Sequence, residues 1–77
     1  MKFEDYKHDA KIFLERKLSA LYLNEKREEK LELLEECLTL AFNDDVLPSR
    51  LAYFVRESDD LSEAKTRIAQ EKYGFGA

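Results

Sequence analysis

Residues 25–42, with the sequence EKREEKLELLEECLTLAF, give the clearest indication of the fold. The stretch contains no glycine or proline, and its leucines recur at steps of three and four, which places them on one side of an α-helix. We therefore predict a helix over residues 25–42. Its apolar side is wide, about 200° at about 100° per residue, so the helix is expected to contact more than one neighbour.

The opposite side of this helix is acidic. Its six glutamates share an arc of about 120°, on which no lysine or arginine falls. They are Glu25, Glu28, Glu29, Glu32, Glu35 and Glu36, here called the acidic row. Like charges three and four residues apart on a helix repel by roughly a few tenths of a kcal/mol per pair, a cost that a basic partner would relieve. We interpret the row either as a binding face for a basic protein or as a solvated face. In the second case Lys7, Lys11 and Lys17 of the preceding helix partly neutralise it.

Three further helices are predicted around this one. Apolar residues at steps of three and four indicate a helix over residues 3–22. Residues 43–45, Asn-Asp-Asp, read as a break whose short polar side chains cap the next helix, over residues 46–57, in whose first turn Pro48 fits. Asp60, followed three residues later by Glu63, approximates a capping box at the start of a helix over residues 61–73.

The expected fold class is all-α, a small bundle of three to four helices in a single domain of 77 residues. Connections of two to four residues favour antiparallel neighbours. We therefore expect a long antiparallel hairpin of the first two helices, with the last two folded against one end of it. A chain this short buries only about 60% of its unfolded surface, so its core is thin.

The charge distribution argues against two classes of partner. The net charge of −4 divides into +1 for residues 1–30, −6 for residues 31–60 and +1 for the remainder. General nucleic-acid binders and anionic-membrane binders need a basic surface, so neither is expected. The single cysteine cannot form an internal disulfide, and no apolar run of signal-peptide or membrane-spanning length is present. A cytoplasmic protein is expected.

The residues that carry catalysis are scarce, and we predict no enzyme, cofactor or small-molecule substrate. The only histidine, His8, lies on the polar side of its helix, whereas Cys37 lies on an apolar side, so a nucleophile and base are not expected to meet. One cysteine and one histidine cannot supply a zinc site, and Glu4 with His8, one turn apart, provide only two ligands. The aspartate pairs lack a calcium loop, and no glycine-rich phosphate loop exists.

A second feature that could indicate binding is surplus apolar surface on the first two helices. The residues in excess of one hairpin interface are Ile12, Tyr22, Leu23, Leu33, Cys37 and Leu40. The last two helices cover them, or a homodimer buries them, which would also enlarge the thin core.

The sequence predicts a non-enzymatic protein–protein interaction module of the adaptor, chaperone or inhibitor type, self-associating as a homodimer, with the acidic row facing a basic partner. One alternative is a helix-turn-helix-like DNA-binding regulator built from residues 46–57 and 61–73. Its phosphate contacts would come from Arg50, Arg56, Lys65, Arg67 and Lys72. A further alternative is an acidic inhibitor that mimics DNA phosphates.

Overall fold

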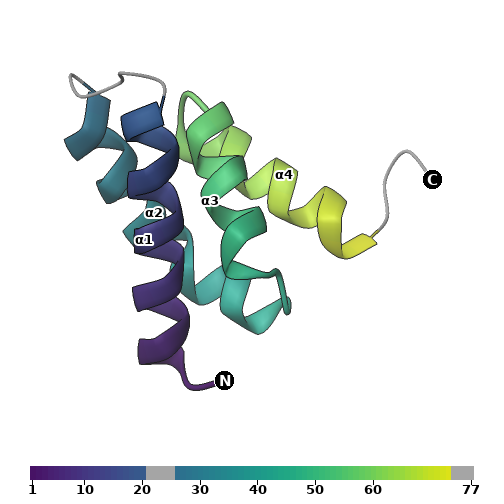
Figure 1. The fold of residues 1–77 in the computed structure, drawn as a ribbon. Helices are drawn as coiled ribbons and strands as arrows, with labels where there is room; N and C mark the ends of the chain where they lie inside the picture. The colour runs from purple at the N-terminus through teal and green to yellow at the C-terminus, as the bar shows by residue number, and fades with distance from the viewer. Residues whose placement is uncertain (21–25, 74–77) are drawn as a thin grey trace.

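The computed structural model describes residues 1–20 and 26–73, and it confirms the all-α class. Its helices are α1 (Phe3–Ala20), α2 (Arg27–Asn43), α3 (Pro48–Glu57) and α4 (Leu61–Tyr73). No strand occurs within these two ranges. In Figure 1, α2 runs antiparallel to α1, α3 returns alongside α1, and α4 leads away from the top of α3. None of the described helices is long and apolar enough to cross a lipid bilayer.

The core lies among all four helices. Its α1 side is a stripe of residues four apart, Tyr6, Ala10, Leu14 and Leu18, each at most 4% exposed. The other helices contribute Cys37, Leu38, Leu51, Val55, Ala64 and Ile68, which are also buried. The most extensive helix contact is between α1 and α3, so α3 packs along α1 and not only against one end of the hairpin. The reason is that α3 buries Leu51, Ala52, Phe54 and Val55, an apolar face too large for a contact at its end alone.

The turn after α2 was expected to cap the next helix, and in the structure it instead ends α2. Asp45 has a positive φ of 57°, its N–H donates to the Phe42 carbonyl, and the Val46 N–H donates to the Ala41 carbonyl at 3.0 Å. This pattern is the Schellman motif, with aspartate where glycine is usual. The aspartate therefore ends α2 and does not cap α3, whose own cap position, Leu47, has extended backbone and no side-chain cap. The α3 helix begins at Pro48 because a residue before proline disfavours helical backbone.

The start of α4 confirms the predicted capping box, with one change. The Glu63 N–H donates to Asp60 Oδ1 at 2.8 Å, as predicted. The Glu63 carboxylate reaches back to the N–H of Asp59, at 3.1 Å, one residue before the position that the motif usually uses. The bond from the Asp59 N–H, and after it a bond from the Arg67 guanidinium, lower the pKa of Glu63. The two capping bonds also fix residues 58–60, here called the α3–α4 turn.

A buried hydrogen bond joins the first turn of α1 to the loop after α2. Tyr6 Oη donates to the Val46 carbonyl at 2.6 Å, and the Tyr6 ring packs edge-on against Phe42 with centroids 5.3 Å apart. Desolvation raises the pKa of Tyr6 to about 12. The contact sets the position of the carboxyl end of α2 relative to α1.

Candidate functional site: the acidic face and groove of α2

The acidic row lies on the outer face of one continuous helix. Glu28, Glu29, Glu32, Glu35 and Glu36 all belong to α2 and are exposed, whereas Glu25 lies outside the described residues. Glu35 forms an ion pair with Lys7 of α1, with 3.4 Å between Nζ and Oε1. The other four form no ion pair with any residue of the described ranges. Four carboxylates on this face therefore face solvent without an internal counter-charge.

The lysines of α1 neutralise this row only in part. Lys7 contacts Glu35, but the ammonium of Lys17 lies over the ring of Tyr53, 5.8 Å from its centroid. Lys11 is exposed and makes no ion pair with a residue of the described ranges. The expectation of a solvated face neutralised by α1 is thus met at one position out of three.

A buried lysine, which the sequence analysis missed, connects α2 to the end of α3. Lys30 is only 8% exposed, and its Nζ donates to the carbonyls of Val55, at 3.2 Å, and Ser58. The last carbonyls of a helix lack internal donors and form the negative end of its dipole, so an ammonium is favourable there. The sequence did contain one indication of this burial. Lys30 stands four and seven residues before Leu34 and Cys37, so it lies on the same side of the helix as these two buried residues.

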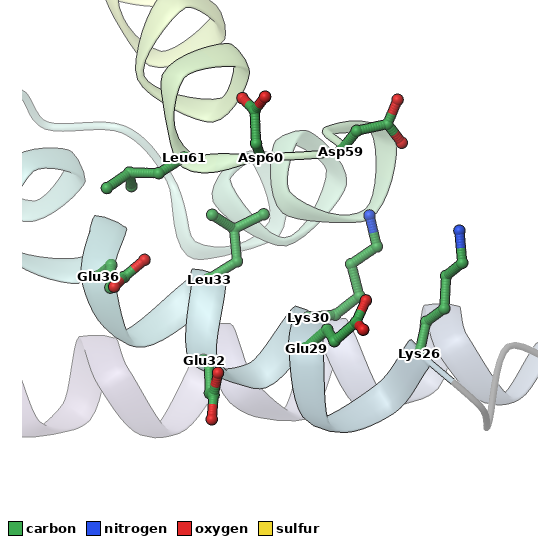
Figure 2. A pocket seen from close by; sticks show the side chains of 9 residues that line it. All are labelled: Lys26, Glu29, Lys30, Glu32, Leu33, Glu36, Asp59, Asp60 and Leu61. Atoms are coloured by element: carbon green, nitrogen blue, oxygen red, sulfur yellow. The ribbon is translucent and has the colours of Figure 1, made fainter.

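Next to Lys30, a groove of about 280 Å³ separates α2 from the α3–α4 turn. It is lined by Lys26, Glu29, Lys30, Glu32, Leu33, Glu36, Asp59, Asp60 and Leu61. Figure 2 shows the Leu33 side chain and both lysines projecting from α2 toward the turn, and the Glu32 carboxylate directed away from it. The Asp59 and Asp60 carboxylates lie on the side of the turn that faces away from α2. Five carboxylates and two lysines border the groove, and one of these lysines, Lys30, is bound to backbone carbonyls. The lining residues carry a formal charge of −3, two lysines against five acids, but the carboxylates of Glu32, Asp59 and Asp60 point away from the space between α2 and the turn.

The residues predicted for self-association are largely part of the internal core. Leu33 and Cys37 are buried at 8% and 0% exposure. Leu40 is half-buried and packs against the core, and Ile12 is half-buried on α1. Tyr22 and Leu23 lie outside the described residues. The surplus apolar surface of α2 is therefore covered within the chain by the packing of α3 and α4, one of the two outcomes that the sequence left open.

Apolar surface remains exposed elsewhere, at the amino end of α1. Met1 is 74% exposed, Leu47 64% and Phe3 37%. A shallow hollow of about 440 Å³ lies beside them, lined in part by Met1, Leu47 and Phe42. No sequence pattern indicated this patch, because Leu47 belongs to a helix in the prediction and to an extended segment in the structure.

The basic residues of the DNA-binding alternative are mostly engaged within the chain. Arg50 pairs with Glu71 at 3.3 Å, Arg67 with Glu63 at 3.2 Å and Lys72 with Asp44 at 3.1 Å. Arg56 is half-buried, and only Lys65 is exposed without an ion pair to the described residues. Helices α3 and α4 therefore present a mixed surface, and no observation favours this alternative.

The two candidate catalytic residues lie in different environments. His8 is exposed on α1, whereas Cys37 is fully buried in the core. Burial, with a smaller effect of Glu36, raises the pKa of the Cys37 thiol to about 11, which disfavours the nucleophilic thiolate. Within residues 1–20 and 26–73, no three histidine, cysteine, aspartate or glutamate side chains are grouped so that they could hold a metal ion.

Comparison with models of protein families, with curated proteins and with solved structures finds no match for this chain. Among the described residues, the outer face of α2 presents four exposed carboxylates without ion pairs, and a groove lies beside it.

Proposed function

We propose that this protein is a non-enzymatic interaction module whose α2 face binds a basic segment of another protein. The observation that supports the proposal is the set of four exposed carboxylates on α2, those of Glu28, Glu29, Glu32 and Glu36, without ion pairs to the described residues. An adaptor, chaperone or inhibitor of cytoplasmic proteins would use such a face. The proposal includes the cytoplasmic setting expected from the sequence.

Electrostatics gives this face a specific role. Carboxylates about 6 Å apart along a helix lie within one Debye length, about 8 Å at physiological ionic strength, so a nearby cation is attracted by several of them at once. Complementary charge of this kind chiefly speeds association and selects orientation, while exposed pairs add at most about 1 kcal/mol each to affinity. The complex is therefore expected to weaken steeply as salt is added.

Self-association is the second part of the proposal. The exposed apolar residues Met1, Phe3 and Leu47 at the amino end of α1 support a homodimer through that end, in place of the buried Leu33 and Cys37. Sedimentation across the micromolar range tests it. A concentration-dependent mass that Leu47→Ser abolishes is expected, and a monomer at every concentration refutes it.

Affinity capture with matched charge variants tests the binding face. The immobilised chain is compared with a triple variant in α2, Glu28→Gln, Glu32→Gln and Glu36→Gln. The control triple removes the same charge from other exposed sites, through Glu4→Gln, Asp5→Asn and Glu57→Gln. A basic protein retained by the wild type and the control but lost with the α2 variant is expected. Identical capture by all three chains refutes the proposal.

A further inference from the structure

We propose that α4 is a strap that swings away from the bundle as a unit, about the link between Ser58 and Asp59, while α1, α2 and α3 stay folded. When closed, α4 covers an apolar face of α2 and α3 that includes Cys37 and Phe54, here called the covered face. Opening admits solvent and other molecules to this face without unfolding the rest of the chain. The inference goes beyond the proposed function and does not depend on it, because it concerns the apolar side of α2.

The α4 helix adds little to the core. Its fully buried side chains among the described residues are those of Ala64 and Ile68, while Leu61 is only partly buried. By comparison, α2 buries six residues and α3 buries five, although α3 is shorter than α4. Apolar burial is the dominant favourable contribution to folding, so α4 is held on the bundle chiefly by one large side chain, that of Ile68.

The packing between α3 and α4 is incomplete. A hollow of about 190 Å³ is lined by residues of both helices, namely Arg50, Phe54, Arg67, Gln70 and Glu71. On α4, the Nε atom of Arg67 is buried without a hydrogen-bond partner among the residues that the structure describes. A buried donor without an acceptor destabilises the closed form, because it has lost its bonds to water. Water reaches this atom when α4 opens, so opening removes the cost.

The hydrogen bonds at the α3–α4 turn fall into two sets that meet between Ser58 and Asp59. Ser58 is bound to the bundle, because its N–H and hydroxyl donate to carbonyls of α3 and its own carbonyl accepts from Lys30. Asp59 and Asp60 are bound to Glu63 of α4. Rotation about the link between the two sets therefore breaks neither of them.

The ion pairs that join α4 to the bundle lie at its surface. Glu71 pairs with Arg50 of α3 at 3.3 Å, and Lys72 pairs with Asp44 at 3.1 Å. Exposed pairs of this kind add little stability, because water competes for the charges and salt screens them. Figure 1 shows the carboxyl end of α4 pointing away from α1 and α3. These pairs therefore do not prevent the strap from opening.

The thiol of Cys37 reports whether the covered face is open. It is fully buried in the closed form. Burial is the main cause that raises the pKa of this thiol, and Lys65 of α4 acts in the opposite direction, which places α4 beside Cys37.

The experiment measures how fast Cys37 of the full chain reacts with 5,5′-dithiobis(2-nitrobenzoic acid) at urea concentrations below the unfolding transition. Opening of α4 alone exposes less surface than global unfolding. The rate should therefore rise with urea much less steeply than the equilibrium constant of unfolding does. A rate that follows the global unfolding curve from zero urea upward overturns the strap.

A matched pair of core variants tests which element must move. Ile68→Ala loosens α4, whereas Leu14→Ala deletes a similar side chain from α1, and both lower the global stability because both side chains are fully buried. We expect Ile68→Ala to speed the labelling of Cys37 at least about tenfold and Leu14→Ala to leave it within about twofold, because only the first changes the opening of α4. Equal acceleration by the two variants overturns the proposal. Should an alanine variant fail to fold, Ile68→Val takes its place, with an expected acceleration of about two- to tenfold, and an unchanged rate in that variant overturns the strap.

Discussion

Replacing Lys30 by methionine is the sharpest test of how the bundle is held together. Methionine keeps an unbranched apolar stem but removes the ammonium that donates to the Val55 and Ser58 carbonyls. Because Lys30 is 8% exposed, water can replace these bonds only in part. A hydrogen bond from a charged donor is worth about 1.5–3 kcal/mol, and a cation at a helix carboxyl end up to about 2 kcal/mol. These terms overlap, so we expect the free energy of unfolding to fall by about 2–3 kcal/mol.

This loss is large for a chain of this size. At roughly 0.05–0.15 kcal/mol per residue the whole domain is stabilised by about 4–12 kcal/mol. One kcal/mol shifts the melting temperature of such a domain by about 4–8 °C, so Lys30→Met should lower it by at least about 8 °C. Urea unfolding followed by circular dichroism measures the change directly. The matched control is Lys26→Met, which removes the same charge one turn earlier from an exposed site and should leave the midpoint unchanged. Equal midpoints for the two variants would show that the bonds from Lys30 to the Val55 and Ser58 carbonyls do not stabilise the fold.

Four further predictions concern the core and the turns. Tyr6→Phe should destabilise the fold by about 1–2 kcal/mol, since it leaves the Val46 carbonyl without its buried donor, and equal urea midpoints would contradict this. Because burial raises the pKa of Tyr6 to about 12 from 10.0, the folded state holds its proton longer, so stability should fall as the pH rises from 10 to 12, and less steeply in Tyr6→Phe. Cys37, with its pKa raised to about 11 and no exposed surface, should react with a thiol reagent only through opening of the fold, and faster in Lys30→Met; a rate equal to that of a free thiol would rule this out. Asp45→Gly should raise stability by about 0.5–1 kcal/mol and Asp45→Ala should lower it, since the position has positive φ, and the reverse order in melting temperature would disprove it.

Much of the fold follows from local patterns. The buried stripe of α1 can be recognised because its residues recur every four positions. Pro48, and the pair Asp60 and Glu63, mark the starts of α3 and α4 through local chemistry. Such signals depend on residues close in sequence, so they need no knowledge of tertiary contacts.

What the sequence left out depends on contacts between distant residues. Lys30 binds carbonyls 25 and 28 residues away, and nothing in its own neighbourhood says that an ammonium will be buried there. The α1 contact with α3 could not be inferred from loop lengths, which indicate only which helices follow one another. The acidic row could be predicted as one face of a helix. The groove beside it could not, because it depends on where the α3–α4 turn lies relative to α2.

Nuclear magnetic resonance can locate the binding site of a basic segment on this protein. Amide chemical shifts of the labelled chain are followed while a short peptide of alternating arginine and glycine is added. If the α2 face holds the peptide, the largest shifts will cluster at residues 28–36 and at the neighbouring Asp59, Asp60 and Leu61. Shifts that centre instead on Met1, Phe3 and Leu47, or on the basic residues of α3 and α4, would contradict it.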